Sequence, residues 1–158
     1  MVIHSDNTAT NILIEFLGID HINNTLLELD LDDTILGTPN LLNADGINLS
    51  APKDMAKLLL GILTGRILSK QSSKDMVTLM SKQKYRWGIP YHLPSTLKIA
   101  NKTGTLSQVR NDCAIIYYPE SPYILTIFTK NIPKAKALIA QLSYLVYTWK
   151  AHHPHPYP

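Results

Sequence analysis

Apolar residues in the first half of the chain recur every three or four positions, a spacing that predicts amphipathic helices. Residue types that cap helices precede several of these runs, with Ser50 the expected cap of one helix and Ser72 or Ser73 of another. Gly18 and Gly65 mark two expected helix ends. The expected helices span residues 9–17, 20–29, 51–63 and about 73–83.

In the second half the apolar spacing changes to two, which predicts half-buried strands. The expected strands cover residues 97–105, 111–118 and 123–129, after an irregular connection over 85–94. A short turn at residues 119–122 makes the last two strands antiparallel neighbours. A closing helix is expected over 132–150, and its predicted apolar face comprises Leu138, Ile139, Leu142, Leu145 and Val146. The pattern predicts an α+β fold, with helices flanking an antiparallel sheet.

The length of 158 residues fits one domain, expected over residues 1–151, followed by a disordered tail of histidine and proline at 152–158. The formal net charge is +3 with scattered basic residues, so we expect no nucleic-acid partner. The longest apolar run, residues 58–63, is too short for a membrane span, and we expect no signal peptide before the folded part. Cys113 is the single cysteine, and its apolar strand suggests a small core residue.

The expected strand at 97–105 changes character halfway along. Its first residues alternate as a half-buried strand does, and then Lys102, Thr103 and Gly104 place a cation, a hydroxyl and a residue without Cβ side by side. Lys102 can hold an anion, Thr103 can donate a hydrogen bond, and Gly104 lets a ligand backbone approach. Taken alone, the tripeptide is more typical of an ordinary strand that enters a hairpin with a surface lysine.

A second motif changes that balance. Ser5-Asp6-Asn7 stands at an expected helix start, about a hundred residues before Lys102-Thr103-Gly104, and Arg110-Asn111-Asp112 opens the next strand. This ordered set resembles the class A β-lactamases and the related penicillin-binding D-Ala-D-Ala peptidases. The resemblance extends from Val2 to about Lys150 and includes the intervening segments Leu31-Asp32-Asp33-Thr34, Leu42-Asn43, Ser50 to Ala56, Ile89-Pro90 and Leu93-Pro94.

The resemblance implies a serine hydrolase that is acylated by β-lactams or D-Ala-D-Ala peptides, with no cofactor and no metal. It implies catalytic roles for Ser5 and Lys102, which would pass a proton to the departing nitrogen. Asn7 would bind the acylamido group of the substrate, whereas Asp6, and Asn43 at the end of the active-site loop, would be structural. The remaining implied substrate-binding residues are Thr103 and Arg110 for the carboxylate, Gly104 for close approach, and Thr105 for a backbone N–H to the oxyanion.

The chain departs from the family pattern at the nucleophile. The family nucleophile is the serine of a Ser-x-x-Lys motif well upstream of Ser-Asp-Asn, but only four residues precede Ser5. The motif occurs elsewhere, starting at Ser50, Ser81 and Ser95, and none of these has the family position. We therefore expect a fold truncated at its N-terminus, with about three strands and four to five helices, and a chain that is inactive alone.

A second departure concerns deacylation. The β-lactamases carry a Glu-x-x-Leu-Asn loop whose glutamate activates water, and aligning Leu42-Asn43 puts Pro39 at the glutamate position. Proline can neither take a proton nor orient water, so the sequence favours a penicillin-binding peptidase, unless a shifted loop lets Asp45 or another acid substitute.

The missing part also has a structural consequence. In the family sheet the strand at 123–129 is internal, so we expect an unpaired edge here, and a chain that is marginally stable, self-associates, or needs a complementing N-terminal fragment. Two alternatives remain: a non-enzymatic binding remnant that holds a substrate carboxylate at the strand edge, and a truncated product without activity. The compartment stays open, with a periplasmic or extracellular location implied by the resemblance alone.

Overall fold

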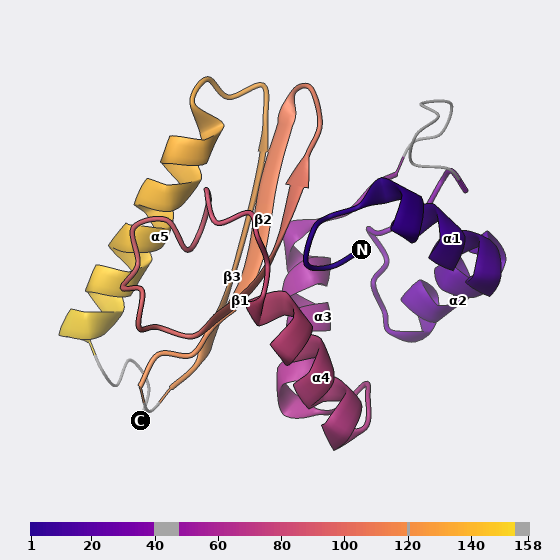
Figure 1. Ribbon diagram of the computed structural model, residues 1–158, viewed down its shortest axis with the longest axis horizontal. Helices are drawn as coiled ribbons and strands as arrows, with labels where there is room; N and C mark the ends of the chain where they lie inside the picture. Colours follow the sequence, from indigo (N-terminus) through magenta and orange to yellow (C-terminus); the bar gives the residue numbers. More distant parts are fainter. Residues whose placement is uncertain (40–47, 120, 154–158) are drawn as a thin grey trace.

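The computed structural model describes residues 1–39, 48–119 and 121–153, and places five helices around three strands (Figure 1). The elements in chain order are α1 (Asn7–Leu17), α2 (Ile19–Glu28), α3 (Pro52–Thr64), α4 (Lys70–Ser81), β1 (Ile99–Thr105), β2 (Val109–Ile116), β3 (Tyr123–Lys130) and α5 (Ala135–His152). The α+β class and the helices flanking an antiparallel sheet are confirmed.

The strands form one antiparallel sheet in the order β1-β2-β3. Lys102 pairs with Cys113, and Arg110 pairs with Thr105 on one side and Thr129 on the other. Within the described sheet, β1 and β3 are therefore the edges. Each offers one row of backbone groups with no strand partner among the described residues.

Alternate residues of the strands face two separate cores. Ala100, Cys113 and Ile115 pack with residues of α3 and α4 on one face, which confirms Cys113 as a core residue. Ile116 packs on the other face, with Ile139 of α5 and residues of the connection before β1. Ile115 and Ile116 have no exposed surface, so each contributes about 1.5–3 kcal/mol of transfer free energy. The sheet thus lies between α5 on one side and α3 and α4 on the other (Figure 1).

The predicted caps of two helices are wrong. α3 begins at Pro52 with Ala51 as its N-cap, and the Ser50 hydroxyl lies 3.1 Å from that of Thr34 instead. Proline has no backbone N–H, so the first helical position has no donor that a capping side chain would have to satisfy. The helix accordingly starts there without a side-chain cap. α4 is capped by Ser69, whose hydroxyl accepts from the Ser72 N–H at 3.0 Å, so this helix starts earlier than expected.

The predicted apolar face of the closing helix is also mostly wrong. Ile139 is buried, but Leu138, Leu142 and Leu145 are exposed. The buried residues of α5 are Ala135, Ile139, Ala140, Ser143 and Lys150. Small residues on that side let the helix lie close to the sheet, and the leucines point away from it. α5 also continues through His152, so the first residue of the predicted disordered tail is helical, while residues 154–158 lie outside the described part.

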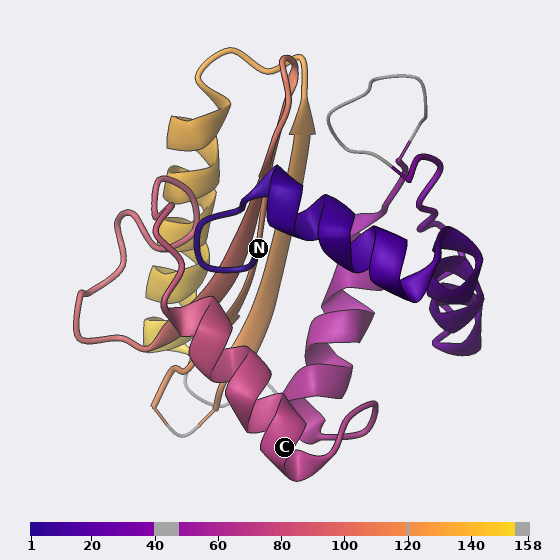
Figure 2. The same ribbon diagram turned by 45° about the vertical axis from the view of Figure 1, so that its right-hand side comes forward.

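The helices α1 and α2 form a pair to one side of the sheet (Figure 2). Among the named elements, α1 packs only against α2. Several large apolar side chains on the pair are exposed, with Phe16 83% exposed and Ile12 60% exposed. Such residues normally lie against another element, so this side of the molecule offers an apolar face.

Candidate active site at the junction of the N-terminal segment and strand β1

The segment before α1 is held against the chain that follows α4. Gln83 is buried, and its side-chain amide donates to the Val2 carbonyl at 2.8 Å. The Lys84 backbone N–H donates to the Ile3 carbonyl at 3.0 Å. These two bonds fix the backbone immediately before Ser5. α4 in turn packs on β1, so the N-terminal segment and the strand are positioned by the same helix.

Ser5 and Lys102 meet at this junction. The Lys102 ammonium donates to the Ser5 hydroxyl oxygen at 2.7 Å and to the Thr103 carbonyl at 2.6 Å. Because the ammonium supplies the proton in the first bond, the Ser5 O–H remains free to donate elsewhere. Burial lowers the pKa of the Lys102 ammonium, and the nearby Asp112 carboxyl partly opposes that effect. A lysine with a lowered pKa can exchange a proton with a hydroxyl more readily than a solvated one.

Ser5 has a left-handed backbone, with φ of 51°. Residues other than glycine, asparagine and aspartate rarely adopt this conformation, and it costs about 1–3 kcal/mol. Asp6 follows as the N-cap of α1, and its carboxylate accepts from the Ala9 N–H at 2.6 Å. The sharp turn at Ser5 therefore lets Asp6 begin the helix while the Ser5 side chain points to Lys102.

The other predicted residues of β1 lie along the edge strand. Thr103 is buried, whereas Gly104 and Thr105 are exposed beside the hairpin. A Cβ added at Gly104 would meet only the Asn111 Cβ at 3.7 Å, an ordinary contact. The protein itself thus leaves room at Gly104, and any need for glycine there would come from a ligand.

Arg110 is engaged within its own hairpin. Its guanidinium donates to the Val109 carbonyl at 2.7 Å and also to the Leu106 carbonyl. A role in binding a carboxylate requires the guanidinium to leave these carbonyls, so the structure does not bring Arg110 to Ser5 and Lys102. Its predicted role stays a prediction.

The remaining predicted residues are not all brought together. Asn7 is the first residue of α1 and is exposed, two positions from Ser5. Asn43 lies outside the described residues, as do Leu42 and Asp45, while Pro39 is exposed. The structure therefore describes the Ser5–Lys102 contact but not the loop on which the deacylation argument depends.

The serines of the three internal Ser-x-x-Lys matches have other surroundings. The Ser50 hydroxyl pairs with that of Thr34, and the Ser81 hydroxyl donates to the Val77 carbonyl one turn earlier at 2.8 Å. Ser95 is exposed in the connection before β1. These local partners are those of ordinary helix and loop serines.

Sequence reasoning assigned no role to Asp112, which the fold buries completely. Its carboxylate accepts from the Ile89 N–H at 2.8 Å and from the Asn101 amide at 3.1 Å. A Cβ at Gly88 would lie only 2.5 Å from the carboxylate, so glycine is required there by space. Burial raises the pKa of Asp112 to about 7, even though the hydrogen bonds from Asn101 and Ile89 lower it. Asp112 thus joins the connection before β1 to the strand pair that carries Lys102.

Two other kinds of site are absent from the part of the chain that the structure describes. No group of three or more histidine, cysteine, aspartate or glutamate side chains there could hold a metal ion. None of the helices described has the length and apolar character needed to cross a bilayer.

Comparison with known proteins identifies relatives over nearly the whole chain. The model of the Beta-lactamase enzyme family matches residues 1–149. β-Lactamase BRO-1 of Moraxella catarrhalis is 29% identical over 141 residues, which cover 85% of this chain and 45% of that protein. The chain therefore spans less than half the length of this relative.

Solved structures share the fold. PBP-A is 31% identical with a TM-score of 0.85, covering 94% of this chain and 57% of that one. A β-lactamase from Sphaerobacter thermophilus DSM 20745 is 29% identical with a TM-score of 0.82, covering 97% of this chain and 60% of that one. A mutant of PBP-A was solved as an acyl-enzyme complex with penicillin G. With the family match and the Ser5–Lys102 geometry in place, the chain belongs to the β-lactamase enzyme family.

Proposed function

We propose that this chain supplies one wall of the active site of a serine hydrolase that is acylated by β-lactams or D-Ala-D-Ala peptides. The observation that carries the proposal is the 2.7 Å hydrogen bond between Lys102 and Ser5. It joins residues 97 positions apart and points an ammonium group at a hydroxyl in a partly buried setting. Such a pair is suited to moving a proton, which the breaking of an amide C–N bond requires.

In the proposed reaction, a serine from outside these 158 residues attacks the amide carbonyl, and its hydroxyl proton passes to the lysine of the same Ser-x-x-Lys segment. The C–N bond then breaks, and the Ser5 hydroxyl gives its proton to the departing nitrogen. Lys102 gives a proton to Ser5 at the same time, so the serine regains its hydroxyl. The lowered pKa of Lys102 favours this transfer, because it makes the ammonium a better acid.

Substrate binding is assigned to the edge of β1. Thr103 would donate its hydroxyl to the substrate carboxylate, and the Thr105 N–H would bind the oxyanion. The substrate backbone would lie along the strand edge as an added strand, with Gly104 allowing close approach. Asn7 would bind the acylamido group through its amide. Arg110 would reach the carboxylate only after leaving the Leu106 and Val109 carbonyls.

The complete domain would need a segment carrying the Ser-x-x-Lys nucleophile. Three features of this chain suit such a segment: the exposed apolar side chains of α1, the exposed leucines of α5, and the free edge of β3. Their common property is apolar or backbone surface that no described residue covers. With Pro39 at the family's glutamate position, we propose a penicillin-binding peptidase that deacylates slowly, acting in a periplasmic or extracellular setting.

The test combines the chain with the N-terminal part of PBP-A that precedes the matched region. Each preparation is incubated with a fluorescent penicillin and analysed by intact-protein mass spectrometry. We expect no covalent adduct on the chain alone, and an adduct on the added fragment when both are present. Lys102→Met and Ser5→Gly should each slow acylation at least tenfold, as removal of a general acid–base group does.

Lys130→Met provides the matched control, because Lys130 is an exposed lysine at the end of β3. Acylation at the parental rate in the Lys102 and Ser5 variants would refute the assigned roles. Reversible, non-covalent binding of penicillin in every preparation would instead support the binding remnant, and no binding in any would support the inactive product.

A further inference from the structure

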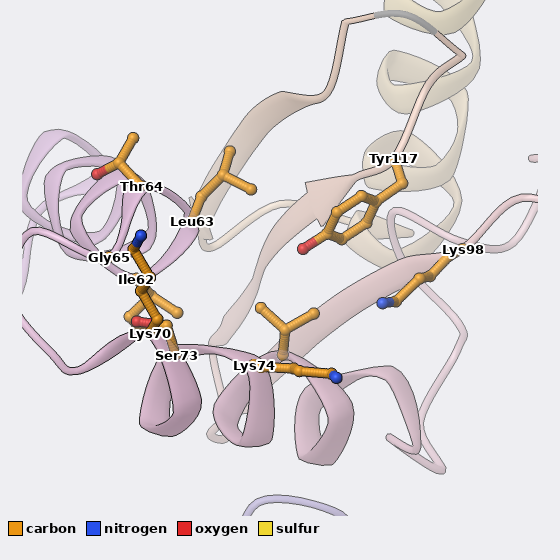
Figure 3. A pocket seen from close by; sticks show the side chains of 10 residues that line it. Ile62, Leu63, Thr64, Gly65, Lys70, Ser73, Lys74, Lys98 and Tyr117 are labelled. Carbon is orange, nitrogen blue, oxygen red and sulfur yellow. The ribbon is translucent and has the colours of Figure 1, made fainter.

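A hollow lies away from Ser5, where the end of α3, the first turns of α4, the start of β1 and the end of β2 meet. Figure 3 shows its lining side chains, among them Ile62, Lys74, Lys98 and Tyr117. Val77 lines the hollow as well. Its volume is about 260 Å³, just below the ~300 Å³ at which small-molecule pockets begin. Neither Ser5 nor Lys102 lines it. The size suits a small molecule and not a folded partner.

The charges around this hollow are all of one sign. Lys70, Lys74 and Lys98 line it, and no aspartate or glutamate does. None of the three lysines forms an ion pair with a carboxylate in the part of the chain that the structure describes. Lys74 and Lys98 extend toward one another from α4 and from the residue before β1 (Figure 3). Together they make a positive potential over a small volume.

One of these cations is already held in place. The Lys98 ammonium lies 4.6 Å from the centre of the Tyr117 ring, within the range of a cation–π contact. The Tyr117 N–H donates to the Lys98 carbonyl at 3.0 Å, so the backbone fixes the same pair. Burial raises the pKa of the Tyr117 hydroxyl, which therefore stays a hydrogen-bond donor at neutral pH. An anion in the hollow would therefore contact the Lys98 ammonium, which the ring holds, and the Tyr117 hydroxyl, which can donate a hydrogen bond.

The hollow also contains a polar group without a partner. Ser73 is only 7% exposed, and its hydroxyl has no hydrogen-bond partner among the described residues. A buried unpaired hydroxyl costs about 1–3 kcal/mol, so its presence calls for an explanation. Ile62 and Val77 give the floor of the hollow an apolar surface beside it.

We propose that this hollow binds a small organic anion in which one phosphate or carboxylate group is attached to an apolar body. The anionic group would contact Lys74, Lys98 and the Tyr117 hydroxyl. The apolar body would lie on Ile62 and Val77, with the Ser73 hydroxyl beneath it. The site does not depend on the function proposed for Ser5 and Lys102, because it shares no residue with that junction. Both sites border α4. The first turns of α4 line the hollow, Gln83 just after α4 holds the segment before Ser5, and α4 packs on β1.

The test is a titration of the ¹⁵N-labelled chain with phenyl phosphate, with inorganic phosphate and benzyl alcohol as partial probes. We expect a saturable, one-to-one change in the amide signals of Gly65, Lys74 and Tyr117. Each partial probe should bind at least tenfold more weakly, because each provides only half of the recognition. Lys74→Gln combined with Lys98→Gln should weaken phenyl phosphate about tenfold, since each solvent-screened lysine–anion pair changes affinity by about two- to fivefold.

The matched control is Lys82→Gln combined with Lys130→Gln, which removes the same charge from exposed lysines outside the hollow. Ser73→Ala should leave the affinity for phenyl phosphate within about twofold, because the hydroxyl lies beneath the apolar body, and should leave the thermal midpoint of the free chain unchanged or higher. Equal affinity for inorganic and phenyl phosphate would overturn the proposal, as would equal weakening in the two double variants. Signal changes confined to residues outside the hollow would overturn it too.

Discussion

Asp112 shows at the scale of one residue how the fold changes a side chain's chemistry. Its carboxyl group has no exposed surface and is held by the Ile89 N–H and the Asn101 amide. Burial disfavours the charged form more than these donors and Lys102 favour it, so the pKa rises to about 7. Near neutral pH the Asp112 carboxyl therefore changes charge. Asp112 pairs with Thr103, the neighbour of Lys102 in the candidate site.

The raised pKa predicts how stability depends on pH. Between about pH 4 and pH 7 the unfolded chain has lost the Asp112 proton while the folded chain keeps it, so the free energy of unfolding falls as pH rises. The shift from 3.8 to about 7 corresponds to about 4 kcal/mol. Asp112→Asn should remove this fall. Urea unfolding of both proteins at pH 4.5 and pH 8 would measure it.

Asn101→Ser is the second variant in that experiment. It leaves the carboxyl in place but removes a hydrogen bond that lowers the Asp112 pKa, so the fall in the free energy of unfolding should persist and extend to higher pH. Parallel pH profiles for the parent and Asp112→Asn would show that Asp112 does not titrate in this range. The Asn101 side-chain oxygen has no partner among the described residues and could accept from an asparagine at 112, which favours folding of that variant.

At the scale of single residues, the sequence predicted the Ser5–Lys102 pair but not the buried Asp112 carboxyl near it. Ser5 and Lys102 stand out because polar residues interrupt otherwise apolar patterns, and the structure brings them to 2.7 Å. Asp112 does not stand out, because a polar residue near a strand start is usually exposed. Its burial depends on Gly88, 24 positions earlier, leaving room for the carboxylate, and such long-range space is not visible in local patterns.

At the scale of elements, the number and order of helices and strands could be predicted, but their ends and faces less well. All eight elements follow from apolar spacing. Ser50 misled because it is a good cap by type, whereas the helix begins at Pro52. Leu142 and Leu145 misled because spacing alone cannot tell which apolar side of α5 faces the sheet. The small residues on the opposite side of α5 let the helix pack closer to the sheet, so that side is the one that is buried.

A prediction at this scale concerns how α5 holds the connection before β1. The Ser143 hydroxyl donates to the Ile89 carbonyl at 2.9 Å, and both residues are buried. Ser143→Ala would leave that carbonyl unpaired and should lower the free energy of unfolding by about 1–3 kcal/mol. Chemical denaturation with a tyrosine or tryptophan fluorescence signal would measure the loss.

Thr148→Ala is the matched change, because the Thr148 hydroxyl also donates to a carbonyl, that of Leu145, but is exposed. This variant should stay within about 0.5 kcal/mol of the parent. Similar losses in the two variants would mean that the Ser143 bond adds nothing specific to the docking of α5.

At the scale of the whole molecule, the described chain has three incomplete surfaces. β3 is an edge strand whose residues are only partly buried, α1 exposes Phe16, and α5 exposes Leu145. The solved relatives are longer, and this chain covers 57% of PBP-A. The sequence predicted the β3 edge through the family resemblance, but the exposed faces of the helices became evident only from the packing.

These surfaces predict that the isolated chain self-associates. We expect sedimentation velocity to show a dimer or larger species at micromolar concentration, with weight-average mass rising with concentration. Addition of the N-terminal part of PBP-A should shift the distribution toward a one-to-one complex. A compact monomer with a cooperative melt, unchanged by the added fragment, would contradict the prediction.

The left-handed backbone at Ser5 has a consequence for engineering this fold. A design procedure that scores folding free energy alone would replace Ser5 with glycine, because glycine adopts this conformation without the steric penalty. The redesigned protein would melt later and keep its shape, and Lys102 would face an empty position. Attempts to make this scaffold more robust should therefore hold position 5 fixed, since the stabilising choice there is the one that erases the hydroxyl.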